Sequence, residues 1–132
     1  MKIAPLVLTF AALAAPALAQ STGATGWTLV SVAGSAVAPG ATIAFSADGA
    51  VFGTTGCNRF NGTVVAAPGV VTFNAPLAVT RIACDDTLMA QEKSVLEALA
   101  GTAAVAYDPV ADRMTLIPDS GAPVLGFARA EQ

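Results

Sequence analysis

Residues 56–62, Gly-Cys-Asn-Arg-Phe-Asn-Gly, form the densest run of chemically distinctive side chains in the sequence. Asn58, Arg59 and Asn61 carry amide and guanidinium donors that could hold a ligand or a partner protein. Glycines and asparagines also favour unusual backbone angles and side-chain-to-backbone hydrogen bonds, which build tight connections between strands. The run therefore predicts either a structural turn, which we favour, or an interaction surface at Asn58, Arg59 and Asn61.

A second segment, Thr-Arg-Ile-Ala-Cys at residues 80–84, supplies one more arginine and the other cysteine. Arg81 joins the candidate interaction residues. Cys57 and Cys84 are the two cysteines of the chain, and in an exported protein such a pair is expected to form a disulfide. A bridge would close a loop of about 28 residues and stabilise the fold by roughly 3–4 kcal/mol on the loop-entropy model. The alternatives are two buried free thiols, or half of a metal site completed by carboxylates.

Glu92 lies close to the apolar stripe of a helix that we expect after Cys84. A carboxylate at the edge of a buried face needs a partner, because an unpaired buried charge is costly. We expect Arg81 or Arg59 to form a structural ion pair with Glu92. As a general acid or base, Glu92 would need a second carboxylate or a nucleophile beside it, and the sequence indicates neither.

The composition narrows the possible functions. The chain has no histidine, which removes Ser-His-Asp and Cys-His catalysis and histidine-containing zinc sites. No catalytic residue, metal site or cofactor is therefore predicted, and we expect a protein that is not an enzyme. The formal net charge is −3 at pH 7 and the basic residues are scattered, so nucleic acid is not an expected partner.

Residues 1–19 have the pattern of a secretory signal peptide. Lys2 precedes an apolar run over residues 6–13, and the final Ala-Leu-Ala matches a small-x-small cleavage site. Cleavage after Ala19 would leave residues 20–132 as a single domain. The apolar run is shorter than the roughly 20 residues that span a bilayer, so no membrane span is expected in the mature form. Without a lipid-bearing cysteine near the cleavage site, the protein is predicted to be periplasmic or secreted.

The rest of the sequence alternates short apolar segments with turn residues. Strands are expected at residues 26–32, 42–45, 50–53, 62–66, 70–73, 103–107, 114–117 and 124–128. Helical spacing of apolar residues predicts a helix over 86–100, with Asp86 as its N-cap and Gly101 ending it. Together they predict an α+β fold: a curved antiparallel sheet, a partly barrel-like meander, with one amphipathic helix packed on it. Trp27 and Leu99 are expected in the core.

The order of these segments resembles the META domain family, whose bacterial members include the HslJ-type heat-shock proteins. The resemblance rests on Trp27, the runs at 56–62 and 80–84, and Glu92 and Leu99 in the helix, and it covers nearly all of the mature chain. It implies a small α+β domain linked to envelope stress, drug tolerance or secretion. It does not imply an established enzymatic activity.

Three functions are compatible with these features. The first is an exported, non-enzymatic accessory or binding domain of the bacterial cell envelope, monomeric and partnered by an unidentified envelope protein. The second is a periplasmic carrier of a small apolar ligand or lipid, held by a curved sheet with an interior of small residues. The third is an extracellular inhibitor or minor hydrolase, which only the size and the predicted disulfide support. We favour the first.

Overall fold

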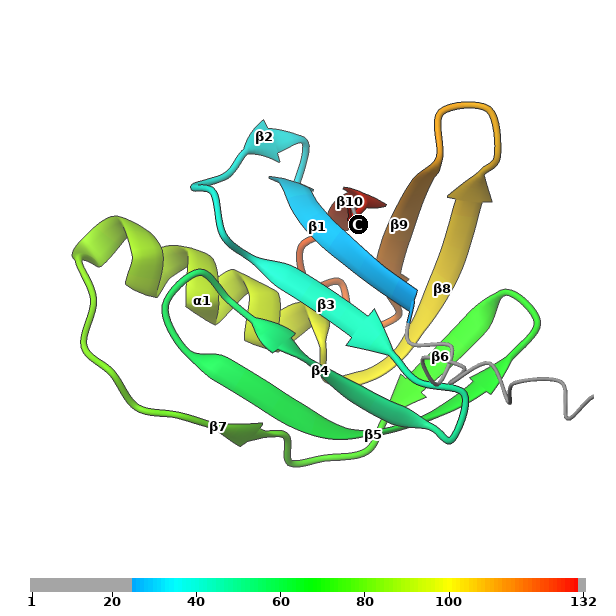
Figure 1. Ribbon diagram of the computed structural model, residues 1–132, viewed down its shortest axis with the longest axis horizontal. Helices are drawn as coiled ribbons and strands as arrows, with labels where there is room; N and C mark the ends of the chain where they lie inside the picture. Colours follow the sequence, from blue (N-terminus) through cyan, green and yellow to red (C-terminus); the bar gives the residue numbers. More distant parts are fainter. Residues whose placement is uncertain (1–24, 131–132) are drawn as a thin grey trace, which may run out of the picture.

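The structure is a computed structural model that describes residues 25–130, so the predicted signal peptide lies outside the described residues. Within that range it contains ten strands and one helix (Figure 1). The strands are β1 (Thr25–Val32), β2 (Ser35–Ala36), β3 (Thr42–Phe45), β4 (Ala50–Thr54), β5 (Arg59–Ala67), β6 (Val70–Phe73), β7 (Ala78–Val79), β8 (Gly101–Asp108), β9 (Arg113–Pro118) and β10 (Leu125–Arg129). The helix is α1 (Asp86–Ala98).

Most of these strands close into an antiparallel barrel. Their order around it is β10-β9-β8-β6-β5-β4-β3-β1, and β1 pairs back onto β10. The two-residue strands β2 and β7 pair outside this ring, with β1 and β5 respectively. The predicted α+β fold, a curved antiparallel sheet with one helix, is confirmed. The sheet closes completely where we had expected it to be only partly barrel-like.

The barrel interior is filled by alternate residues of the strands, as the two-residue period of a strand requires. Trp27 and Leu99 are 5% and 1% exposed, so their predicted core positions are confirmed. The other large buried apolar side chains are Leu29, Ile43, Val51, Phe60, Val64, Val71, Phe73, Val95, Met114, Leu116, Leu125 and Phe127.

Helix α1 lies across one end of the barrel, on the left of Figure 1. Its N-cap is Asp85, whose side-chain oxygen accepts a hydrogen bond of 2.8 Å from the Leu88 N–H. The predicted N-cap, Asp86, is therefore wrong by one residue, because Asp85 has the extended backbone of a cap and Asp86 is already helical. The helix also ends at Ala98, earlier than predicted, and Gly101 begins β8 with a φ of +73°.

Strand β5 begins at Arg59, three residues before its predicted start at residue 62. Asparagine and glycine are disfavoured in strands, but pairing with β4 overrides that preference here. Arg59 lies opposite Thr54, and Asn61 lies opposite Phe52. Phe60 points into the core between them, which leaves Arg59 and Asn61 exposed on the outer surface of the barrel.

Among residues 25–130, no helix has the length and apolar character that crossing a bilayer requires. The single helix has 13 residues and mixed polarity.

Candidate functional site

The side chain of Asn58 joins three segments beneath the helix. Its carbonyl oxygen accepts hydrogen bonds from the Thr80 hydroxyl at 2.9 Å and the Ile82 N–H at 2.6 Å. Its amide nitrogen donates to the Ile82 carbonyl and to a Glu92 carboxylate oxygen, both at 3.1 Å. At 1% exposure, Asn58 offers nothing to a partner. Of the two readings of Asn58 made from the sequence, the geometry supports the structural one.

Glu92 is buried on the helix face that packs against this segment, and an arginine is not its partner. One carboxylate oxygen accepts the Thr55 hydroxyl at 2.8 Å and the other accepts the Asn58 amide. The one salt bridge within residues 25–130 joins Arg129 to Asp112. The predicted ion pair of Glu92 with Arg81 or Arg59 is therefore wrong. Neutral donors that point inward from residues 55–58 satisfy this carboxylate, while both arginines point to solvent.

Gln91, next to Glu92 on the helix, binds two further backbone segments. Its amide nitrogen donates to the Thr55 carbonyl and its oxygen accepts the Ala38 N–H, both at 2.9 Å. Gly56 has a φ of +99°, and a β-carbon there would come within 3.1 Å of the Gln91 amide. Only glycine fits both the backbone angle and the space. Gly56 therefore belongs to the surface on which the helix packs. We call this surface, formed by Thr55, Gly56 and Asn58 beneath Gln91 and Glu92, the Asn58 seat.

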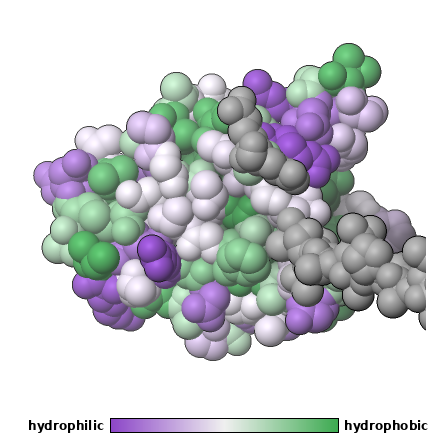
Figure 2. Space-filling view, viewed as in Figure 1, coloured by the Kyte–Doolittle hydropathy of each residue, from purple (hydrophilic) through white to green (hydrophobic). Residues whose placement is uncertain are grey.

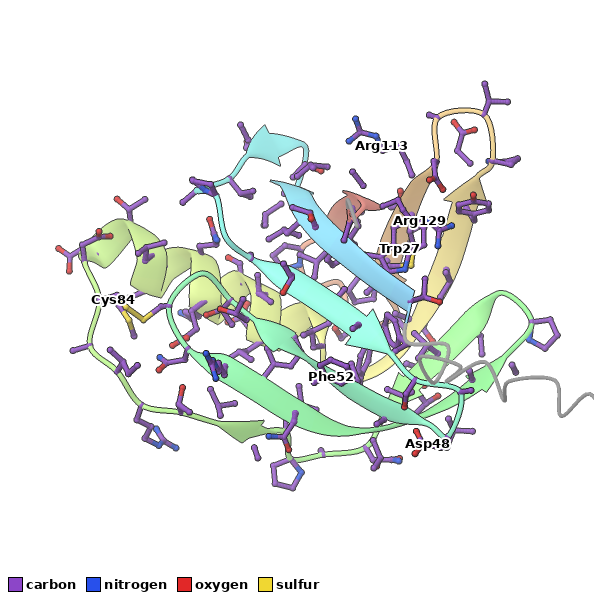
Figure 3. The ribbon with its side chains drawn as sticks, in the orientation of Figure 1. Trp27, Asp48, Phe52, Cys84, Arg113 and Arg129 are labelled. Atoms are coloured by element: carbon purple, nitrogen blue, oxygen red, sulfur yellow. A yellow bond between two sulfur atoms is a disulfide. The ribbon has the colours of Figure 1, made fainter. Side chains whose placement is uncertain are left out.

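A disulfide between Cys57 and Cys84 fastens the same seat from outside. The two α-carbons are 6.1 Å apart, a separation that suits a disulfide, and Figure 3 shows the bond at Cys84, just before the helix. The predicted pairing is confirmed. The bridge holds the start of α1 against the turn that carries Asn58.

The other candidate interaction residues remain on the surface. Arg59 and Asn61 lie side by side along β5 and are exposed. Arg81 is also exposed, in the segment between β7 and α1. Across residues 25–130, the guanidinium groups of Arg59 and Arg81 make no hydrogen bond or ion pair within the protein. These groups are therefore available to a partner.

Sequence reasoning missed the residue that completes this surface, Phe52. It is 42% exposed on the outer face of β4, directly opposite Asn61. Figure 3 labels it there, and Figure 2 shows that the face over β3, β4 and β5 is mostly pale or green, with few hydrophilic residues. A hollow of about 390 Å³ lies over this surface. We call it the Phe52 surface, and its outward-facing members are Thr42, Phe52, Thr54, Arg59 and Asn61.

A second polar cluster lies at the end of the barrel away from the helix, on the inward-facing sides of β1, β8 and β10. The Arg129 guanidinium stacks over the Trp27 ring, 4.3 Å from its centre, and pairs with Asp112 at 3.1 Å (Figure 3). The Tyr107 hydroxyl donates to the same carboxylate at 2.7 Å. Arg129, then Tyr107, lowers the pKa of Asp112, and Asp112 raises the pKa of Arg129. Each group is engaged by another, so the cluster closes the barrel seam and offers no reactive group.

Potential metal ligands are dispersed in the part of the chain that the structure describes. No three acidic or cysteine side chains gather there as ligands would. Beneath the helix the Thr55 hydroxyl donates to the Glu92 carboxylate, but both side chains are buried, so the pair is not open to a substrate.

Comparison with known proteins identifies the family. The META domain matches residues 19–131, which is nearly the whole sequence. The protein belongs to the META domain family. The predicted membership of this family is thereby confirmed.

Solved structures agree with this META domain assignment. One protein solved by NMR is 26% identical, with a TM-score of 0.62 over 77% of this chain and 86% of the other. An NMR structure of a protein from Burkholderia xenovorans is 29% identical, with a TM-score of 0.61 over 82% and 83% of the two chains. A DUF4847 family protein from Bacteroides vulgatus, 24% identical with a TM-score of 0.50 over 70% and 61%, shares the fold. The comparison with curated proteins found no match.

Proposed function

We propose that this META domain protein is an exported, non-enzymatic binding domain of the bacterial cell envelope, which contacts a partner protein through the Phe52 surface. The observation that carries the proposal is an exposed phenylalanine near an arginine whose guanidinium has no partner among residues 25–130, both on paired strands of a closed barrel. Aromatic residues and arginine dominate the binding energy of many protein interfaces.

The chemistry of the surface defines the partner. Phe52 offers a large apolar contact, Arg59 a cationic fork, and Asn61 both a donor and an acceptor. None of the described residues that line the hollow above them is acidic. The matching surface on the partner protein therefore combines an apolar side chain, which packs on Phe52, with a carboxylate that pairs with Arg59.

Export is supported by features that lie apart from this surface. The signal-like pattern of residues 1–19 predicts it, and a disulfide suits an oxidising compartment such as the periplasm. Fractionation of cells together with the mass of the purified protein tests it. A periplasmic product that begins at Gln20 is expected, whereas a cytoplasmic product that keeps residue 1 would contradict export.

Photo-crosslinking in living cells tests the surface. A photoreactive phenylalanine analogue at position 52 is compared with the same analogue at Ile117, which faces outward from β9 and is 43% exposed against 42% for Phe52. One discrete adduct from position 52, absent from position 117 and lost when Arg59→Glu is added, supports a partner protein. Equal labelling at both positions, or an adduct indifferent to Arg59→Glu, would overturn the proposal.

Arg59→Glu is a suitable companion change because the Arg59 side chain is exposed and its contacts with Thr80 are made by the backbone: its N–H donates to the Thr80 hydroxyl and its carbonyl accepts the Thr80 N–H. The variant should therefore fold normally. Reversing the charge turns the expected carboxylate pair into a repulsion. Turnover of a substrate by the pure protein, abolished by one polar substitution, would contradict the non-enzymatic role.

A further inference from the structure

The end of the barrel opposite the helix is open. Ala66 on β5 shows this directly, because it points inward on the same face as buried Val64 and lies opposite buried Val71. Ala66 is nevertheless exposed to solvent. An inward-facing residue that water reaches marks the wall of an accessible cavity. The β3–β4 and β5–β6 turns, on the right of Figure 1, rim this end.

The cavity has a volume of about 520 Å³, within the range of roughly 300–1,000 Å³ that is typical of small-molecule sites. Its walls are aliphatic, with Val64, Val71, Val105, Met114 and Leu116 among them. The residual gap at the helix end of the same barrel is about 10 Å³. The open end is therefore a built apolar recess, and loose packing throughout the barrel does not explain it.

Within residues 25–130, the lining of the cavity includes one charged residue and no basic one; Arg129, at the same end of the barrel, is not part of the lining and is paired with Asp112. Asp48, in the β3–β4 turn, is the charged residue among those that line it, and Figure 3 shows it at the tip of that hairpin. The Ser46 hydroxyl donates to the Asp48 carboxylate. This hydrogen bond, followed by the Ala50 N–H, lowers the pKa of Asp48, so the group is ionised at neutral pH. A cationic group at the rim is favoured and an anionic one is repelled.

We propose that the open end of the barrel binds a slender aliphatic ligand that carries a cationic head group, with its chain among Val64, Val71 and Met114 and its head beside Asp48. The recess takes the apolar chain out of water, which supplies most of the affinity. The carboxylate selects the charge of the head. This site is separate from the Phe52 surface and does not depend on it.

Calorimetric titration with two surfactants of equal chain length, each below its micelle concentration, tests the site. Dodecyltrimethylammonium carries the cationic head, and dodecyl sulfate is the anionic control. We expect saturable binding of the cation, with the largest NMR shifts at the methyl groups of Met114, Val64 and Val71. Asp48→Asn should weaken the cation about two- to fivefold, as for an exposed ion pair, and should not weaken the sulfate.

A matched pair of variants on β5 separates the cavity from the outer surface. Ala66→Phe fills the mouth from inside and should abolish binding, while Val65→Phe, on the outward-facing neighbour that is 62% exposed, should leave it unchanged. Arg59→Glu should also leave it unchanged, so failure here is distinct from failure of the Phe52 surface. Equal affinity for both surfactants with no response to Asp48→Asn, or methyl shifts spread over the outer face, would overturn the proposal even if Ala66→Phe did not fold.

Discussion

The two ends of the barrel are built on opposite principles. The helix end is closed by Val95 and Leu99, by the hydrogen-bonded group Thr55, Asn58 and Glu92, and by a disulfide. Within residues 25–130, every buried polar side-chain atom has a hydrogen-bond partner. At the other end, among the described residues, Trp27 and Arg129 cover the side formed by β1 and β10, whereas the side formed by β5 and β6 is uncovered and the inward-facing Ala66 is exposed there. Thus the polar residues and cysteines that stand out in the sequence close the helix end of the barrel, while aliphatic residues line the recess.

Among the changes that test this difference between the two ends, loss of the disulfide should have the largest effect on the unfolding free energy. The Cys57→Ala, Cys84→Ala double variant should lose about 3–4 kcal/mol of unfolding free energy, because the unfolded chain regains the freedom of the closed loop. Urea unfolding with and without reductant measures it, and the double variant, which has no bond to reduce, is the control. Hydrogen exchange should accelerate first at the start of α1 and not around Ala66. Uniform acceleration at both ends would break the contrast.

Asn58→Ala should cause the second-largest loss of unfolding free energy. It leaves one Glu92 oxygen buried without a partner and removes the hydrogen bonds to Thr80 and Ile82, which should cost about 2–4 kcal/mol of unfolding free energy. Asn74→Ala is the control, since the Asn74 amide makes one exposed hydrogen bond, of 2.9 Å to the Thr63 hydroxyl; its loss should be within about 0.5 kcal/mol. Equal losses of unfolding free energy for Asn58→Ala and Asn74→Ala would show that the Asn58 hydrogen bonds stabilise the fold no more than one exposed hydrogen bond does.

The same experiment checks the partner of Glu92. Because the carboxylate is bonded to Thr55 and Asn58, Arg59→Ala and Arg81→Ala should each change the unfolding free energy by less than about 0.5 kcal/mol. If either variant lost several times that much unfolding free energy, the result would indicate that this arginine pairs with Glu92, as the sequence predicted.

Enlarging one alanine at each end compares the packing directly. Ala98, on the helix, is 0% exposed, so Ala98→Phe should cost about 1–3 kcal/mol through overpacking. Ala66→Phe, at the open end, should change the unfolding free energy by less than about 0.5 kcal/mol. Thermal unfolding of both variants decides. A comparable loss in Ala66→Phe would mean that the recess closes in solution.

Much of this architecture could be predicted from the sequence. Alternating apolar residues gave β3 and β6 their bounds, helical spacing located α1, and two cysteines in an exported-type chain indicated the bridge. The partner of Glu92 could not be predicted, because whether Asn58 or Arg59 points inward depends on the start of β5. That start is set by pairing with β4 and not by local propensity.

The candidate surfaces were harder to predict for a related reason. Phe52 belongs to a short apolar run, and only its register in the closed barrel places it outside while Val51 is 0% exposed. The recess is space that the described side chains do not fill. A sequence pattern of valines and alanines is the same whether the space beside them is filled or empty. Only the three-dimensional arrangement separates these cases.

Acid titration should give the smallest effect, at the Asp112–Arg129 pair where β10 meets β1, near the open end of the barrel. The folded pKa of Asp112 lies below its ordinary value of 3.8, chiefly because Arg129 and then Tyr107 donate hydrogen bonds to it. Its stabilisation is therefore present above pH 3.8 and is lost as the pH falls through the lowered folded pKa. Asp112→Asn should unfold with a shallower dependence on pH below 4 than the parent, and 1 M salt should reduce the difference because both partners are exposed.

Asp48→Asn removes the other carboxylate with a lowered pKa. It should independently make the dependence of stability on pH below 4 shallower. If the two changes together were not additive, the Asp112–Arg129 cluster and the Asp48 turn would be coupled, and the covered and uncovered sides of the open end would not be independent.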